Sequence, residues 1–137
     1  MKVFEAVKEN LNGVNEFVEE SLNKLSCDIK TRMQIMIAVE EVFVNIANYA
    51  YESGSGDVSV DIAVSESPET IEIKFTDEGI AYNPLEKEDP DIHSDVDSRP
   101  IGGLGIFMTK QIMDEITYEN IDGKNVLTLK KKTEREV

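Results

Sequence analysis

Residues 29–51 constrain the fold more than any other segment, because their apolar side chains recur at helical spacing along the whole stretch. The side chains form two adjacent stripes: Ile35, Val39, Val42, Ile46 and Tyr49, and Met36, Phe43, Ala47 and Ala50. Residues three or four positions apart share one face of an α-helix, so the stripes together make one wide apolar face. The rest of the chain must supply a surface that buries this face.

The segments that follow alternate between apolar and polar residues, which is typical of strands with one buried face. The clearest examples are residues 58–64 and 71–75, which are separated by a turn at residues 67–69. Near the end of the chain, residues 115–120 and 126–129 flank Asp122-Gly123, a signal for a type I′ hairpin turn. The sequence therefore predicts two hairpins of a sheet.

Two further helices and a short strand complete the predicted elements. Residues 11–25 and 106–116 repeat apolar side chains at helical spacing, and residues 2–7 partly alternate like an edge strand. This order predicts an α+β fold, a two-layer sandwich with three main helices on one face of a mixed, mostly antiparallel sheet. The length of 137 residues suits a single domain over residues 1–137.

The composition narrows the class of protein. A net charge of −14 argues against direct binding to nucleic acid, whose phosphates need clustered Lys and Arg, and it leaves basic protein partners open. No run approaches the ~20 apolar residues of a membrane span, so no membrane partner is expected. Cys27 is the sole cysteine, which excludes an internal disulfide bond. A cytoplasmic protein is the simplest expectation.

Gly102, Gly103 and Gly105 immediately precede the third predicted helix. Glycine in a helix costs about 1 kcal/mol relative to alanine, so such a cluster needs a reason. One interpretation is an anion site, because backbone N–H groups at a helix N-terminus bind phosphate. The other is an ordinary sharp turn into a helix. The cluster matches neither a P-loop nor a G-x-G-x-x-G motif after a strand, so both interpretations stay open.

A polar stripe lies beside the apolar face of the long helix and includes Glu41, Asn45 and Asn48. Glu41 and Asn45 are four positions apart and share a helix face. An amide oxygen suits Mg²⁺, and a glutamate can accept a proton from a hydroxyl group. The alternative is a polar rim at the edge of the core, and this pair alone does not decide between the two.

Asp77 and Gly79 follow the second alternating strand. A buried aspartate there can accept a hydrogen bond from an exocyclic amine, and a glycine lets a ring approach the backbone. An ordinary strand-ending turn explains the same residues. The acidic segment from there to Ile101 carries prolines and no periodicity, and it is longer than about 15 residues, which is typical of a functional loop or lid.

Taken in order, these segments resemble the Bergerat-fold ATPases, the group that includes gyrase, heat-shock, histidine kinase and mismatch-repair ATP-binding domains. Residues 41–45 (EVFVN) are similar to the N box of that group, residues 77–79 (DEG) to its first glycine box, and residues 102–105 (GGLG) to its second. The spacing and the small size resemble one branch, the anti-sigma-factor serine/threonine kinases. Three further segments carry the same likeness: residues 82–85 (YNPL), 113–115 (MDE) and 123–129 (GKNVLTL).

This resemblance implies a role for each matching residue. Asn45 would hold Mg²⁺ between the phosphates of ATP, Asp77 would read the adenine amine, and Glu41 would act as general base toward a serine hydroxyl of a partner protein. Residues from about 86 to 101 would form an ATP lid. The implied nucleotide-binding set is Asn45, Asn48, Asp77, Gly79, Ala81, Gly102, Gly103, Leu104, Gly105 and Ile106.

Two residues depart from the family pattern. Ala81 stands where the wider superfamily usually has the second glycine of the first box, and Tyr49 stands where these kinases commonly have a histidine. Neither change touches the residues assigned to phosphoryl transfer, but both leave the affinity for nucleotide open.

The resemblance implies an ATP-dependent serine/threonine protein kinase that acts as an anti-sigma factor or a similar partner-switching regulator. ATP and Mg²⁺ would be its cofactors. A sigma factor and a phosphorylated anti-sigma-factor antagonist would be its protein partners. Because kinases of this branch are often dimers, the resemblance also implies a possible homodimer. Two alternatives stay open: a nucleotide-binding regulatory module of the same fold without kinase activity, and an interaction domain that binds no nucleotide.

Overall fold

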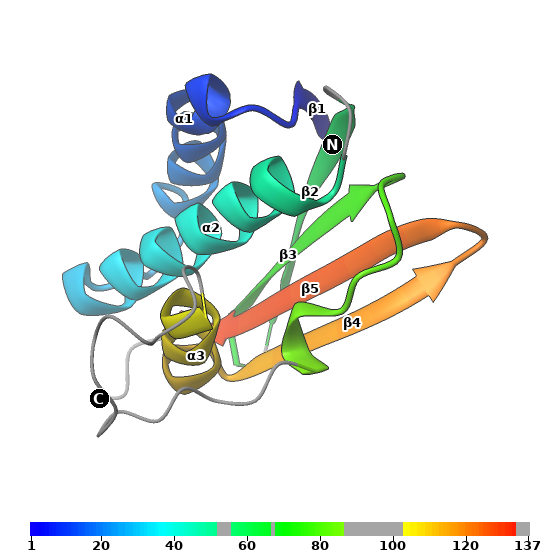
Figure 1. The fold of residues 1–137 in the computed structure, drawn as a ribbon. Helices are drawn as coiled ribbons and strands as arrows, with labels where there is room; N and C mark the ends of the chain where they lie inside the picture. The colour runs from blue at the N-terminus through cyan, green and yellow to red at the C-terminus, as the bar shows by residue number, and fades with distance from the viewer. Residues whose placement is uncertain (52–55, 67, 87–102, 134–137) are drawn as a thin grey trace.

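Three helices lie on one face of a five-stranded sheet in the computed structural model, which describes residues 1–51, 56–66, 68–86 and 103–133 (Figure 1). The strand order is β1-β2-β3-β5-β4, and each of the four described strand pairs is antiparallel. The α+β expectation is therefore confirmed, with a sheet that contains no parallel pair within the described ranges. The helices are α1 (Leu11–Leu22), α2 (Ile29–Tyr49) and α3 (Gly103–Ile112); the strands are β1 (Lys2–Glu5), β2 (Asp57–Ser65), β3 (Thr70–Asp77), β4 (Glu115–Ile121) and β5 (Lys124–Lys132); and the 3₁₀ turns are η1 (Lys8–Asn10) and η2 (Pro84–Glu86).

The central helix α2 begins at a side-chain cap and buries the wide face expected from its sequence. Asp28 precedes the helix, and its Oδ1 accepts a hydrogen bond of 2.7 Å from the backbone N–H of Thr31. This bond satisfies one of the N–H groups that a helix start leaves without a partner. The buried side chains of α2 are Ile35, Ala38, Val39, Val42, Phe43 and Ile46.

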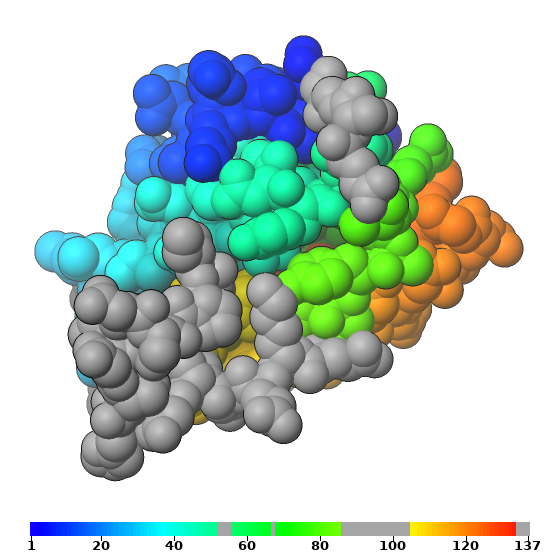
Figure 2. Space-filling view, viewed as in Figure 1, coloured from blue at the N-terminus to red at the C-terminus, as the bar shows by residue number. Residues whose placement is uncertain are grey.

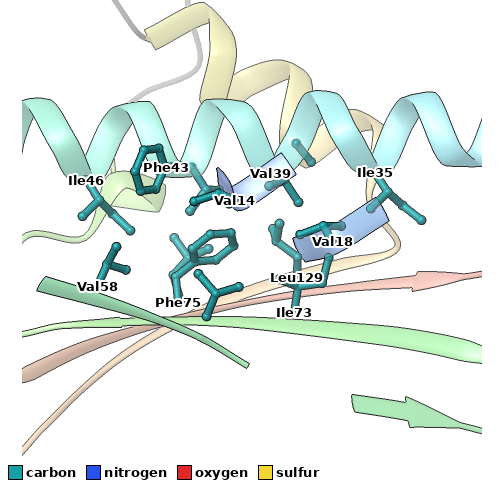
Figure 3. Packing of buried hydrophobic residues seen from close by; sticks show 14 of the residues in the cluster. Val14, Val18, Ile35, Val39, Phe43, Ile46, Val58, Ile73, Phe75 and Leu129 are labelled. Carbon is teal, nitrogen blue, oxygen red and sulfur yellow. The ribbon is translucent and has the colours of Figure 1, made fainter. Parts of the chain in front are cut away.

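Alternation along the strands supplies the opposite wall of the core. In β3, Ile71, Ile73 and Phe75 are buried, and Phe75 lies between Val60 of β2 and Leu127 of β5. Figure 3 shows the α2 side chains pointing toward these strand residues, with residues of α1 in the same layer. The face of α2 therefore packs on the inward side of the sheet, as its periodicity requires.

The β4–β5 hairpin confirms the turn expected at Asp122-Gly123. Both residues have positive φ, 51° and 80°, and Ile121 pairs directly with Lys124. A two-residue loop with φ > 0 at both positions is a type I′ turn, whose twist matches that of the strands. The hairpin fixes the register of β5, and with it which β5 side chains face the helices.

Two polar side chains take inward positions where the hydrophobic layer ends. Asp77 follows Ile71, Ile73 and Phe75 in the inward alternation of β3 and is 5% exposed. Its direct neighbour across the β3–β5 pair is Asn125, which is 6% exposed. The sheet therefore places an acid and an amide side by side on the face that α2 covers.

The lid expected at about residues 86–101, and with it Gly102, lies outside the described residues except for Glu86 at the end of η2. Within the described ranges, none of the helices has the length and apolar character that crossing a membrane requires.

We expect Phe75→Ala to lower the free energy of unfolding by about 3–5 kcal/mol, because the phenyl ring fills the layer between α2 and the sheet. Urea denaturation followed by far-ultraviolet circular dichroism measures the change. Lys74→Ala, on the same strand but facing outward, serves as the matched control and should change stability by no more than about 0.5 kcal/mol. Equal losses for the two variants would contradict the observed strand orientation.

Candidate functional site

A partly open pocket lies between the C-terminal half of α2, the segment that follows β3, the start of α3 and the β4–β5 hairpin. Figure 2 shows the segment after β3 beside α2 on this face. The pocket is lined by Val42, Asn45, Ile46, Tyr49, Ala50, Asp77, Ile80, Tyr82, Pro84, Ile106, Tyr118, Asn125 and Leu127.

The walls of this pocket are mainly apolar and carry only a few polar groups. Aliphatic side chains come from α2, α3 and β5, and Tyr49 contacts Tyr82 with ring centroids 5.9 Å apart. Asp77, Asn45 and Asn125 contribute polar atoms. Apolar walls with a few placed polar groups are typical of sites that bind flat, partly polar ligands. Tyr49, a departure from the family pattern, is thus part of the pocket wall.

Asp77 offers a single carboxylate oxygen to the pocket. Its Oδ1 accepts hydrogen bonds from the backbone N–H of Gly79 (2.9 Å) and from Nδ2 of Asn125 (3.0 Å). Within the described residues, both hydrogen bonds of the side chain fall on Oδ1. The second oxygen, Oδ2, accepts none within those residues and is an acceptor for a ligand that presents an N–H group.

Gly79 lies where the turn after β3 touches the end of α2. The backbone N–H of Ile80 donates a 2.8 Å hydrogen bond to the carbonyl oxygen of Ala50. A Cβ atom at Gly79 would lie 2.1 Å from that same oxygen, closer than any real contact. Glycine is therefore required for this close approach, which holds the Asp77 turn against α2.

Glu41 and Gly105 are in direct contact between α2 and α3. A Cβ atom at Gly105 would lie 1.8 Å from Oε2 of Glu41 and 2.5 Å from its Cδ. The half-buried carboxylate thus occupies the space that a larger residue in the first turn of α3 would need. Burial, and after it the nearby charge of Glu40, raises the pKa of Glu41 above the ordinary carboxylate value. A carboxylate with a raised pKa is a stronger base.

The structure brings together some of the residues expected from the sequence. Asn45, Asp77 and Ile106 line the pocket, and Glu41 lies one helical turn before Asn45 beside Gly105. Gly103 and Leu104 form the start of α3. Asn48 and Ala81 are exposed and are not among the residues that line the pocket.

Sequence reasoning missed Asn125 and Tyr118, which both line the pocket. The sequence did contain a signal for Asn125. Alternate residues of a strand face the same side, so Asn125 shares the inward face of Leu127 and Leu129 although it is polar. An amide at a core position is unusual unless its hydrogen bonds are satisfied there. Tyr118 pairs with Leu127 across the hairpin and is directed inward with it.

The fold is that of an α+β domain with a pocket at one edge of its core, and the chain belongs to the histidine kinase-like ATPase domain family, whose model matches residues 4–131. Among curated proteins, it is 24% identical over 100 residues to the serine/threonine-protein kinase BtrW of Bordetella bronchiseptica, a match that covers 73% of this chain and 70% of BtrW. It is 31% identical over 98 residues to the serine-protein kinase RsbW of Bacillus mycoides, covering 69% of this chain and 60% of RsbW. The match therefore spans less than two thirds of the RsbW length.

Solved structures show the same fold at low sequence identity. The catalytic domain of histidine kinase ThkA, in a nucleotide-free form, superposes with a TM-score of 0.54 at 17% identity over 99% of this chain and 100% of that one. The histidine kinase domain of the blue-light activated histidine kinase from Erythrobacter litoralis EL346 gives 0.52 at 17% identity, covering 75% of this chain and 45% of that one. The expected family and fold are thus confirmed.

We expect Gly105→Ala to destabilise the protein by about 1 kcal/mol or less, because the new methyl group would overlap the Glu41 carboxylate, which lies at the end of a flexible side chain and can turn away. Gly13→Ala in α1 is the matched control: its nearest neighbour is the Phe4 ring at 3.3 Å, and alanine has the higher helix propensity, so this variant should be neutral or stabilised. Thermal unfolding measures both. Adding Glu41→Ala to Gly105→Ala should restore stability, and a Gly105→Ala variant as stable as Gly13→Ala would contradict the contact.

Proposed function

We propose that this chain is an ATP-dependent serine/threonine protein kinase that acts as an anti-sigma factor or a similar partner-switching regulator. The observation that carries the proposal is the position of Glu41, whose carboxylate lies against the first turn of α3 and one helical turn from the pocket residue Asn45. The names of the relatives BtrW and RsbW support the kinase class. A sigma factor, an antagonist protein with a serine or threonine hydroxyl, a homodimeric state and a cytoplasmic location belong to the same proposal.

The chemistry of the pocket lining supports binding of the base of ATP. Oδ2 of Asp77 is an acceptor, and the exocyclic amine of adenine is a donor. Ala50, Ile80, Ile106 and Leu127 provide apolar surface for a flat ring. These contacts support adenine recognition by Asp77, with Gly79 holding the turn that carries it.

We assign phosphate binding to the start of α3. Backbone N–H groups at a helix N-terminus attract anions, and Gly103 and Leu104 supply the first of them in α3. Asn45 offers an amide oxygen on the facing helix, and Mg²⁺ is held in proteins by such oxygens together with substrate phosphates. We assign Mg²⁺ binding to Asn45 on this basis.

Glu41 has the chemistry of a general base. In the proposed step, the carboxylate takes the proton of a serine or threonine hydroxyl on the partner protein. The hydroxyl oxygen then attacks the γ-phosphorus, the bond to the β–γ bridging oxygen breaks, and ADP leaves with that electron pair. Such transfer depends mostly on positioning and charge neutralisation, which the facing helices α2 and α3 provide.

We expect Mg-ATP to raise the thermal stability of the protein, by about 2.7 kcal/mol at a concentration 100 times the Kd. Asp77→Asn should abolish most of the shift, because its amide oxygen can keep the Gly79 and Asn125 contacts while an N–H donor replaces the Oδ2 acceptor proposed for the adenine amine. Asp122→Asn, in an exposed turn where asparagine tolerates positive φ, is the control and should keep the full shift. The absence of any shift at millimolar Mg-ATP would favour an interaction domain that binds no nucleotide.

Glu41→Gln should keep ATP binding and lower phosphoryl transfer to an antagonist protein by about 100-fold or more, as the loss of a general base does. Transfer from radiolabelled ATP measures this. In the wild type, transfer should fall as the pH falls through the raised pKa of Glu41, since only the ionised form accepts a proton.

Glu40→Gln is the matched control for that experiment. It should retain transfer and move the acid limb to lower pH, because the Glu40 charge contributes to the raised pKa of Glu41. Transfer that is unchanged in Glu41→Gln would remove Glu41 as the base. Nucleotide binding without any transfer in the wild type would favour the regulatory module without kinase activity.

A further inference from the structure

Asn125 is the buried centre of a hydrogen-bond network beneath the pocket. It takes an inward position on β5, directly opposite Asp77 in the β3–β5 register. Its Nδ2 donates to Oδ1 of Asp77 at 3.0 Å and to the carbonyl oxygen of Ile80 at 2.7 Å. The amide therefore ties the last residue of β3 to the turn that follows it.

The other end of the same amide is satisfied by the neighbouring strand. Oδ1 of Asn125 accepts hydrogen bonds from the hydroxyl group of Tyr118 and, at 3.2 Å, from Nδ2 of Asn120. A flipped amide would face its oxygen toward the Asp77 carboxylate and the Ile80 carbonyl, which can only accept. These two acceptors fix which way Asn125 points, and the two β4 residues satisfy its oxygen in that orientation.

This orientation decides what Asp77 can recognise. Oδ1 of Asp77 already accepts from Gly79 and Asn125, so the carboxylate plane is held at two points. The other oxygen of the carboxylate can only accept a hydrogen bond. A base that presents an amine at that edge is favoured, and one that presents a carbonyl oxygen is disfavoured.

We propose that Asn125, whose amide oxygen is satisfied by Tyr118 and Asn120, is a positioning residue that makes the pocket select adenine over guanine nucleotides. The inference rests on the proposed function, because it assumes that the pocket binds a nucleotide base. It assigns the selectivity to Asn125 of β5, which contacts Asp77 directly, and to Tyr118 and Asn120 of β4, which act through Asn125. A purely structural role would instead support the fold without affecting the choice of base.

The test compares the Kd of Mg-ATP with that of Mg-GTP by titration calorimetry on the full chain. For Asn125→Leu, which removes the amide and keeps an apolar body of similar size, we expect the ratio of Kd for GTP to Kd for ATP to fall by about tenfold or more. Tyr118→Phe keeps the ring that lines the pocket and removes the hydroxyl donor alone. It should lower the ratio in the same direction by about threefold.

Thr128→Val is the matched control. Thr128 lies on β5 between the inward-facing Leu127 and Leu129, so its side chain faces away from the pocket, and the ratio should stay at the wild-type value.

Tyr118→Phe keeps the test decisive if Asn125→Leu does not fold. Equal losses of affinity for the two nucleotides in Asn125→Leu, with an unchanged ratio in Tyr118→Phe, would overturn the inference and leave the network a structural one. A wild type that binds neither nucleotide would contradict the proposed function and this inference together.

Discussion

The burial of the apolar face of α2 on the inward side of the sheet is the interaction on which the other features depend. It places the N-terminal half of the helix over hydrophobic strand positions and the C-terminal half over Asp77 and Asn125. α3 then packs on the flank of α2 that carries Glu41. The pocket lies where the hydrophobic layer ends and polar side chains take over the inward positions, so its place follows from how α2 crosses the sheet.

Local periodicity was sufficient to predict most of this architecture, because each element has one buried face and the spacing of apolar residues reports it. The observed α2 ends two residues before the predicted end, and the Asp122-Gly123 turn has the positive φ values that its sequence indicates. Asp77 could also be predicted from the sequence, because an acidic residue at the end of a strand stands out from the alternation before it. Its inward direction follows from the alternation that begins at Ile71.

The contacts that complete the candidate site could not be read from local sequence, because they join residues far apart in the chain. Gly79 and Gly105 were expected to let a ligand approach the backbone, and that expectation stays a prediction. The structure adds a different reason for each: a carbonyl group of α2 lies against Gly79, and a carboxylate of α2 lies against Gly105. The amide of Asn125 reaches Asp77 across 48 residues of sequence, and no spacing rule reports such a pair.

Both glycines therefore touch the same rigid helix, one at Glu41 and the other at Ala50. Those two residues are nine positions apart, which at 1.5 Å per residue is about 13.5 Å along the helix axis. Under the proposed function, α2 thus fixes the separation between base recognition and proton transfer. Insertion of a single residue between them would turn Glu41 by about 100° relative to Ala50, so natural length variation should fall outside this part of the chain.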